Sequence, residues 1–157
     1  ILSRKLGVET INLGFSGSGK MEMEVAKILA EMPADVYILD CVPNPTPQQL
    51  EERALPFVQY LRQKKPKTPI IMVESIYRET AYWNAKTKVM VEQQNQAFRK
   101  AYEVLCQQNP ANLYYIPSAD LIGQDHEATV DGTHLSDVGF MRFTDVLAPY
   151  LQKLLGN

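Results

Sequence analysis

A carboxylate and an imidazole stand three residues apart near the C-terminal end of the chain. They are Asp131 and His134 in an Asp-Gly-Thr-His run, and His134 is one of 2 histidines in the sequence. A carboxylate at this spacing can hold the imidazole in one tautomer and stabilise its protonated form, as a general base for a hydroxyl nucleophile requires. The pair predicts the base end of a serine hydrolase. A solvated turn is the alternative for these residues.

A glycine-rich turn, Gly-Phe-Ser-Gly-Ser-Gly at residues 14–19, precedes a predicted helix. With Lys20 it matches the phosphate-binding loop of nucleotide hydrolases except at the last position, where Met21 replaces the hydroxyl residue that would ligate magnesium. A phosphotransferase that uses Gly14 to Lys20 is therefore an alternative, weakened by this thioether. Such a turn can also direct backbone N–H groups at the oxyanion of acyl transfer.

Composition narrows the class of protein. The 157 residues, 45% hydrophobic and 22% charged, predict one globular domain over residues 1–157. A net charge of -2 offers no basic face for nucleic acid or for an acidic membrane surface. No apolar run approaches the roughly 20 residues that span a bilayer. We expect a small-molecule substrate and neither a nucleic-acid nor a membrane partner.

Apolar patterning predicts strands that alternate with helices. Strands are expected at residues 9–13, 34–41, 69–74 and 113–116, and helices at 21–32, 47–65, 85–108 and 136–155. This alternation implies right-handed crossovers and a parallel sheet with helices on both faces. The ligand crevice of such a sheet lies beyond the carboxyl ends of its strands, where we expect the loops at 15–19, 42–44 and 131–134.

Three motifs follow one another in a definite order. They are Asn-Leu-Gly-Phe-Ser-Gly at 12–17, Leu-Asp-Cys-Val-Pro-Asn at 39–44, and Asp-Gly-Thr-His at 131–134. Together they resemble the SGNH (GDSL-like) lipase and acylhydrolase family, in the branch with Asn-Leu-Gly-Phe-Ser-Gly and Asp-Cys-Xaa-Pro-Asn blocks. The resemblance covers nearly the whole chain. It implies a three-layer αβα sandwich with a mainly parallel, flavodoxin-like sheet, and ester hydrolysis that requires no metal or other cofactor.

The resemblance also assigns roles to four residues. Gly17 would donate its backbone N–H to the oxyanion and Asn44 its side-chain amide. His134 would be the general base and Asp131 its orienting acid. The alternatives are that Gly17 serves only a tight turn and that Asn44, between two prolines, only caps one.

The nucleophile of the family is a serine in a Gly-Asp-Ser-like block, on a first strand ahead of a helix that residues 1–7 resemble. Ser16 and Ser18 occupy the oxyanion block and Ser3 the helix remnant, so no serine of this chain is a convincing substitute. The resemblance implies a domain truncated at its N-terminus, with its first strand missing. We expect no ester turnover from this chain alone, and a sheet edge that a further N-terminal segment completes.

The sequence thus predicts a serine esterase that hydrolyses small acyl esters. Because relatives often deacylate carbohydrates, an acetylated sugar is the expected substrate. The aromatic residues Tyr77, Tyr82 and Trp83 could form a sugar platform or could pack on their own core. A non-catalytic relative that binds a ligand in the same crevice is a further alternative.

Overall fold

The computed structural model describes residues 1–109, 111–119 and 121–156. Its centre is a parallel sheet of three strands in the order β1 (Tyr37–Leu39), β2 (Ile70–Val73) and β3 (Leu113–Ile116). Every residue of β2 is buried, as expected of a central strand covered on both faces. The strands predicted at 34–41, 69–74 and 113–116 are confirmed, the first of them with much shorter bounds.

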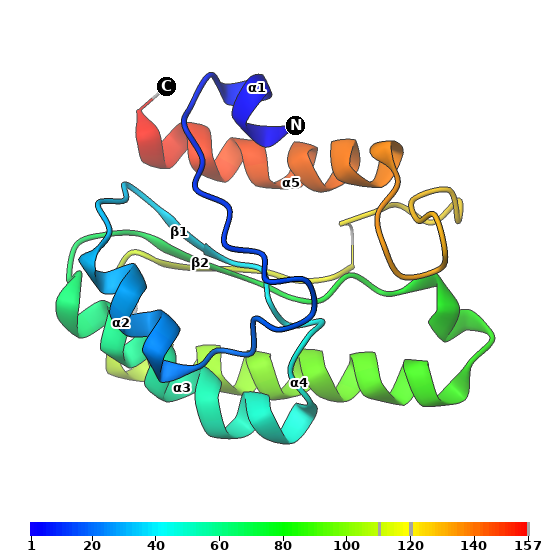
Figure 1. Ribbon diagram of the computed structural model, residues 1–157, viewed down its shortest axis with the longest axis horizontal. Coiled ribbons are helices and arrows are strands. Elements are labelled where there is room, and N and C mark those ends of the chain that lie inside the picture. The colour runs from blue at the N-terminus through cyan, green and yellow to red at the C-terminus, as the bar shows by residue number, and fades with distance from the viewer. Residues whose placement is uncertain (110, 120, 157) are drawn as a thin grey trace.

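Helices cover both faces of the sheet, so the predicted three-layer α/β architecture is confirmed (Figure 1). α1 (Leu2–Leu6) and α5 (Asp137–Leu155) lie on one face. The other face carries α2 (Met23–Glu31), α3 (Pro47–Lys64) and α4 (Ala85–Gln108). A 3-10 helix, η1 (Glu79–Tyr82), precedes α4. Each face has its own hydrophobic core, and no described helix is long and apolar enough to cross a membrane.

The helix boundaries follow from local capping. Thr46 accepts a hydrogen bond from the backbone of Gln49, and the Gln49 side chain accepts one from the backbone of Thr46, which forms a capping box at the start of α3. Asn84 caps α4, and Ser136 caps α5 through the backbone N–H of Gly139. These caps fix the points at which the loops of the crevice enter the helices.

The strand predicted at residues 9–13 is wrong, because these residues form an exposed, extended segment with no strand pairing. Ile11 is 57% exposed although it is apolar. A strand needs a neighbour to pair its backbone groups. Within the described residues β1 pairs only with β2. Its other edge is free, and residues 9–13 do not pair with it.

Candidate active site

The predicted acid and base are in direct contact. Asp131 Oδ2 lies 2.7 Å from His134 Nδ1, and Asp131 Oδ1 accepts the backbone N–H groups of Thr133 and His134 at 2.9 and 2.8 Å. These backbone bonds and the imidazole hold the pKa of Asp131 low, at about 2. Because an ionised carboxylate only accepts, Nδ1 carries the proton and Nε2 is left to act as a base.

The loop that carries this pair is fastened to η1. The backbone N–H and the hydroxyl of Thr80 both donate to the carbonyl oxygen of Gly132, each at 2.9 Å. Gly132 has φ 86°, and a Cβ at this position would lie 2.4 Å from Thr80 Oγ1. Only glycine satisfies both the left-handed backbone and the close approach. The sequence signal for this contact is limited to the glycine between the acid and the base.

The two predicted oxyanion donors lie on neighbouring loops. Gly17 has φ 84°, and the space where its Cβ would project is open, so an atom can approach its backbone closely. Asn44 Nδ2 donates one hydrogen to the carbonyl oxygen of Gly19 at 3.3 Å. An amide nitrogen has two hydrogens, and the second makes no bond within the described residues. Asn44 can therefore donate to a ligand while it remains tied to the glycine loop.

The turn around Asn44 is held by side chains from beyond β2. Gln94, buried on α4, donates to the carbonyl oxygen of Pro45 at 2.6 Å, and Arg78 Nη2 donates to that of Pro43 at 3.0 Å. Gln94 Oε1 in turn accepts from Arg78 Nη2 at 2.9 Å. These bonds fix the backbone on both sides of Asn44, so the amide is positioned before any ligand arrives.

One cavity of about 520 Å³ joins these groups at the carboxyl ends of the strands. Gly17, Asn44 and His134 all line it, together with Asp40 and Arg78. Asp131 is not among the lining residues and supports His134 from behind. The structure thus brings together three of the four predicted site residues around one space and places the fourth in contact with the base. Acyl transfer requires a base and N–H donors around one space, and these three residues can supply them.

Comparison with known proteins agrees with this geometry. A family model described as GDSL-like Lipase/Acylhydrolase family matches residues 1–152. The chain belongs to this family. A crystal structure described as a GDSL-like lipase from Bacteroides ovatus is 48% identical, with a TM-score of 0.93 over 99% of this chain and 46% of that one.

Two more distant structures show the same fold as this GDSL-like family member. A salicylyl-acyltransferase, SsfX3, from a tetracycline biosynthetic pathway is 22% identical, with a TM-score of 0.77 over 99% of this chain and 48% of that one. A peptidoglycan O-acetylesterase is 21% identical, with a TM-score of 0.57 over 84% of this chain and 41% of that one. The chain spans less than half the length of all three. No curated protein matches it.

Neither the nucleotide-binding alternative nor the non-catalytic one gains support from these comparisons. In the GDSL-like chain, the Met21 side chain is buried in the hydrophobic core and offers no hydroxyl ligand to a magnesium ion. The backbone N–H of Lys20 donates to Glu22 Oε2 at 2.8 Å. A carboxylate thus already occupies a position at the start of α2 that a phosphate would need.

Several residues around the site escaped sequence reasoning. Gln94 and Asn95 lie on the buried face of α4 between Val91 and Phe98, and a polar residue on such a face must bond to something nearby. The sequence therefore could have predicted that these two side chains form hydrogen bonds, but not with which residues. Arg78 and Thr80 follow β2 in a stretch without a regular pattern, and nothing in the sequence singles them out.

A second acid–histidine pair lies outside the cavity. Buried Glu79 of η1 places Oε2 2.5 Å from His126 Nδ1, and the His126 ring meets that of Tyr82 edge-on at 4.7 Å. Neither member of this pair lines the cavity that holds Gly17 and Asn44.

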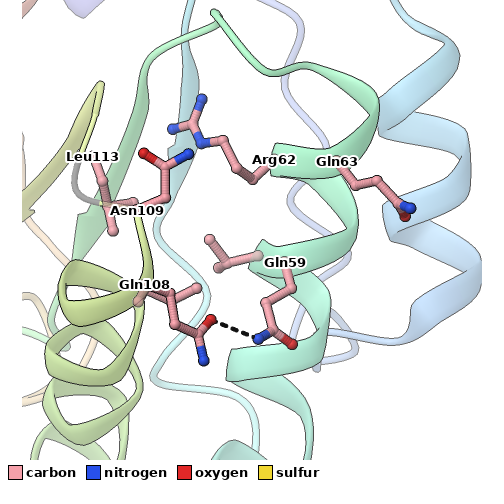
Figure 2. A pocket seen from close by; sticks show the side chains of 8 residues that line it. Gln59, Arg62, Gln63, Gln108, Asn109 and Leu113 are labelled. Carbon is pink, nitrogen blue, oxygen red and sulfur yellow. Dashed lines mark hydrogen bonds between the residues drawn. The ribbon is translucent and has the colours of Figure 1, made fainter.

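A further cavity, of about 240 Å³, lies between α3 and α4 near the amino end of β3 (Figure 2). Figure 2 shows Gln59 and Gln108 bonded to each other across it, at 2.8 Å. Arg62 at its edge donates to the carbonyl oxygens of Lys65, Pro66, Thr68 and Asn112. These bonds join the loop that precedes β2 to the loop that precedes β3. The polar side chains around this cavity therefore have a structural role.

Proposed function

We propose that this chain is the base-and-oxyanion part of a serine esterase that hydrolyses small acyl esters. The observation that carries the proposal is one cavity lined by His134, Gly17 and Asn44. Membership of the GDSL-like lipase/acylhydrolase family supports the same class of reaction. In this arrangement each oxyanion donor contributes about 3 kcal/mol to lowering the barrier.

In the proposed reaction His134 Nε2 accepts the proton of a serine hydroxyl as its oxygen attacks the ester carbonyl carbon. The charge on the carbonyl oxygen is stabilised by Gly17 and Asn44. The alcohol leaves with the proton returned by His134, and the acyl group stays on the serine. Water, deprotonated by the same base, then releases the acid and restores the serine. Asp131 keeps the imidazole oriented and stabilises its cationic form throughout.

We propose that the serine is supplied by an extended segment outside this sequence, which adds a strand at the free edge of β1. A groove of about 280 Å³ runs between residues 12–15 and this edge. Leu13 and Phe15 line it from one side, and Ile38 and Leu39 from the other. An added strand would pair the unpaired backbone of β1 and bury these apolar side chains.

A carbohydrate ester is the substrate that the surroundings of the cavity favour. Trp83 is 71% exposed, and its Cζ2 lies 3.4 Å from the point where a Cβ of Gly132 would stand, beside the acid–base loop. Tyr82 is exposed next to it on η1. An exposed aromatic ring at this position can stack on a sugar ring while an acetyl group enters the cavity.

The test is fluorophosphonate labelling of the full natural protein, with peptide mass spectrometry to locate the adduct. We expect an adduct on one serine encoded upstream of Ile1, lost in His134→Ala and retained in the matched control His126→Ala. No adduct, or an adduct equally strong in His134→Ala, would contradict the proposal.

A further inference from the structure

Arg78 stands on the wall of the active-site cavity with much of its guanidinium unused. Its Nη2 donates to the carbonyl oxygen of Pro43 and to Gln94 Oε1. Its Nε is buried and has no hydrogen-bond partner within the described residues. A buried N–H without an acceptor is destabilising, more so on a charged group, so this arrangement needs an explanation.

The other arginines inside the fold have their charge or their donors satisfied. Three form ion pairs with carboxylates: Arg53 with Glu22, Arg99 with Glu74, and Arg142 with Asp125. Arg62 bonds to four carbonyl oxygens at the opposite end of the sheet. Among the described residues no carboxylate lies within ion-pair distance of Arg78. Burial without a counter-charge lowers the pKa of Arg78 but leaves the group cationic at neutral pH.

The charges around the cavity do not neutralise Arg78. The acidic residue that lines the same space is Asp40, which makes no ion pair with it. Asp40 is exposed, so solvent screens its charge. The cavity therefore presents the unpaired positive charge of Arg78 on the same wall system as His134, which suits one negative charge on a ligand.

We propose that Arg78 forms a subsite for a carboxylate on the substrate, so that the enzyme prefers esters with a free carboxylate close to the scissile bond. This inference rests on the proposed esterase function and specifies its substrate class. A single unpaired guanidinium matches a singly charged group, and a charge-assisted hydrogen bond to it is roughly twice as strong as a neutral one. Binding would also bring a negative counter-charge to a cation that has none among the described residues.

Two matched substrate pairs test the subsite and locate the carboxylate. On the acyl side, a hemisuccinate ester is compared with the levulinate ester of the same alcohol, in which a methyl ketone replaces the carboxylate. On the alcohol side, an acetylated methyl glucuronide is compared with the corresponding glucuronamide. In one of the two substrate pairs we expect Arg78→Met to lower kcat/KM for the carboxylate ester about 10- to 100-fold more than for its neutral partner. The pair that shows this difference tells on which side of the ester the carboxylate lies.

Controls separate the subsite from a loss of structure. Arg78→Met also removes a bond to the turn of Asn44, but that effect lowers both members of a pair alike. Arg78→Lys should restore part of the preference, and Arg4→Met, which removes the same charge from exposed α1, should leave it unchanged. Equal losses for both members of each pair would overturn the proposal.

If the protein hydrolyses none of these esters and is not labelled by fluorophosphonate, the proposed esterase function is wrong. The carboxylate subsite is then tested by binding alone. Calorimetry with free succinate and with methyl glucuronide on the same full natural protein then decides it. Binding that is at least 10-fold weaker in Arg78→Met supports the carboxylate subsite. Equal binding, or none, by both proteins refutes it.

Discussion

The molecule contains two acid–histidine pairs of nearly the same local geometry and very different surroundings. Asp131 and His134 stand in one loop with both side chains exposed, and their contact measures 2.7 Å. Glu79 is buried, and it reaches 2.5 Å to His126 across 47 positions of sequence. His134 of the first pair lines a cavity with Gly17 and Asn44, whereas His126 of the second meets the ring of Tyr82.

A short contact between an acid and an imidazole is therefore not enough to make a catalytic pair. A general base also needs a reacting group within reach of its free nitrogen and donors that stabilise the charge formed there. His134 shares its cavity with Gly17 and Asn44, the two proposed donors. The Glu79–His126 pair instead joins η1 to the loop that follows β3, which is a structural task.

Replacement of the two histidines gives the largest expected contrast. In the full natural protein, His134→Ala should lower kcat for ester hydrolysis by at least about 10³-fold, because the serine loses its base. His126→Ala should change kcat by less than about 3-fold, since its ring lines no part of the cavity. Steady-state rates on a phenyl acetate check both. Similar losses in the two variants would remove the distinction between the pairs.

Substitution of Asp131 should reduce activity, whereas substitution of Glu79 should reduce stability. Asp131→Asn should lower kcat about 10²-fold or more with little change in melting temperature, because the side chain is exposed. Since the pKa of Asp131 is about 2, its carboxylate stays ionised between pH 5 and 9, and its own protonation should not limit the wild-type rate in that range. Glu79→Gln should instead lower the free energy of unfolding by about 1–3 kcal/mol, measured by urea denaturation. A loss of rate in Glu79→Gln as large as in Asp131→Asn would contradict this separation.

The smallest effect is expected at Thr80, the neighbour of Glu79 that fastens the catalytic loop. Thr80→Val keeps the shape but removes the hydroxyl bond to Gly132, so we expect a fall of about 5- to 10-fold in kcat with KM unchanged. Thr80→Ser keeps the donor and should recover most of the rate. A change in KM alone, or no recovery in Thr80→Ser, would exclude a positioning role.

Much of the fold follows from the sequence because its causes are local. The bounds of α4 and β3 agree with prediction, since Asn84 caps the helix and an apolar run marks the strand. The strand predicted at 9–13 fails because a strand depends on a neighbour that local pattern does not describe.

The candidate site divides in the same way between local and long-range causes. The motifs contain Gly17, Asn44, Asp131 and His134, and the fold places three of them around one cavity and Asp131 against His134. The supports of these residues were not predicted, because they act over long distances in sequence. Thr80 bonds a residue 52 positions away, and Gln94 bonds one 49 positions away. A short motif indicates which side chains meet a ligand but not which side chains hold the motif in place.

The bond between Asn44 and Gly19 has a spectroscopic consequence. The two hydrogens of Asn44 Nδ2 occupy unlike environments, one bonded to the Gly19 carbonyl oxygen and one free of bonds within the described residues. They should give two well-separated resonances in a nitrogen–proton correlation spectrum. A ligand oxygen in the cavity would move the resonance of the free hydrogen first, while displacement of the glycine loop would move the other. The side chain proposed to stabilise the oxyanion thus reports both the filling of the cavity and the movement of its wall.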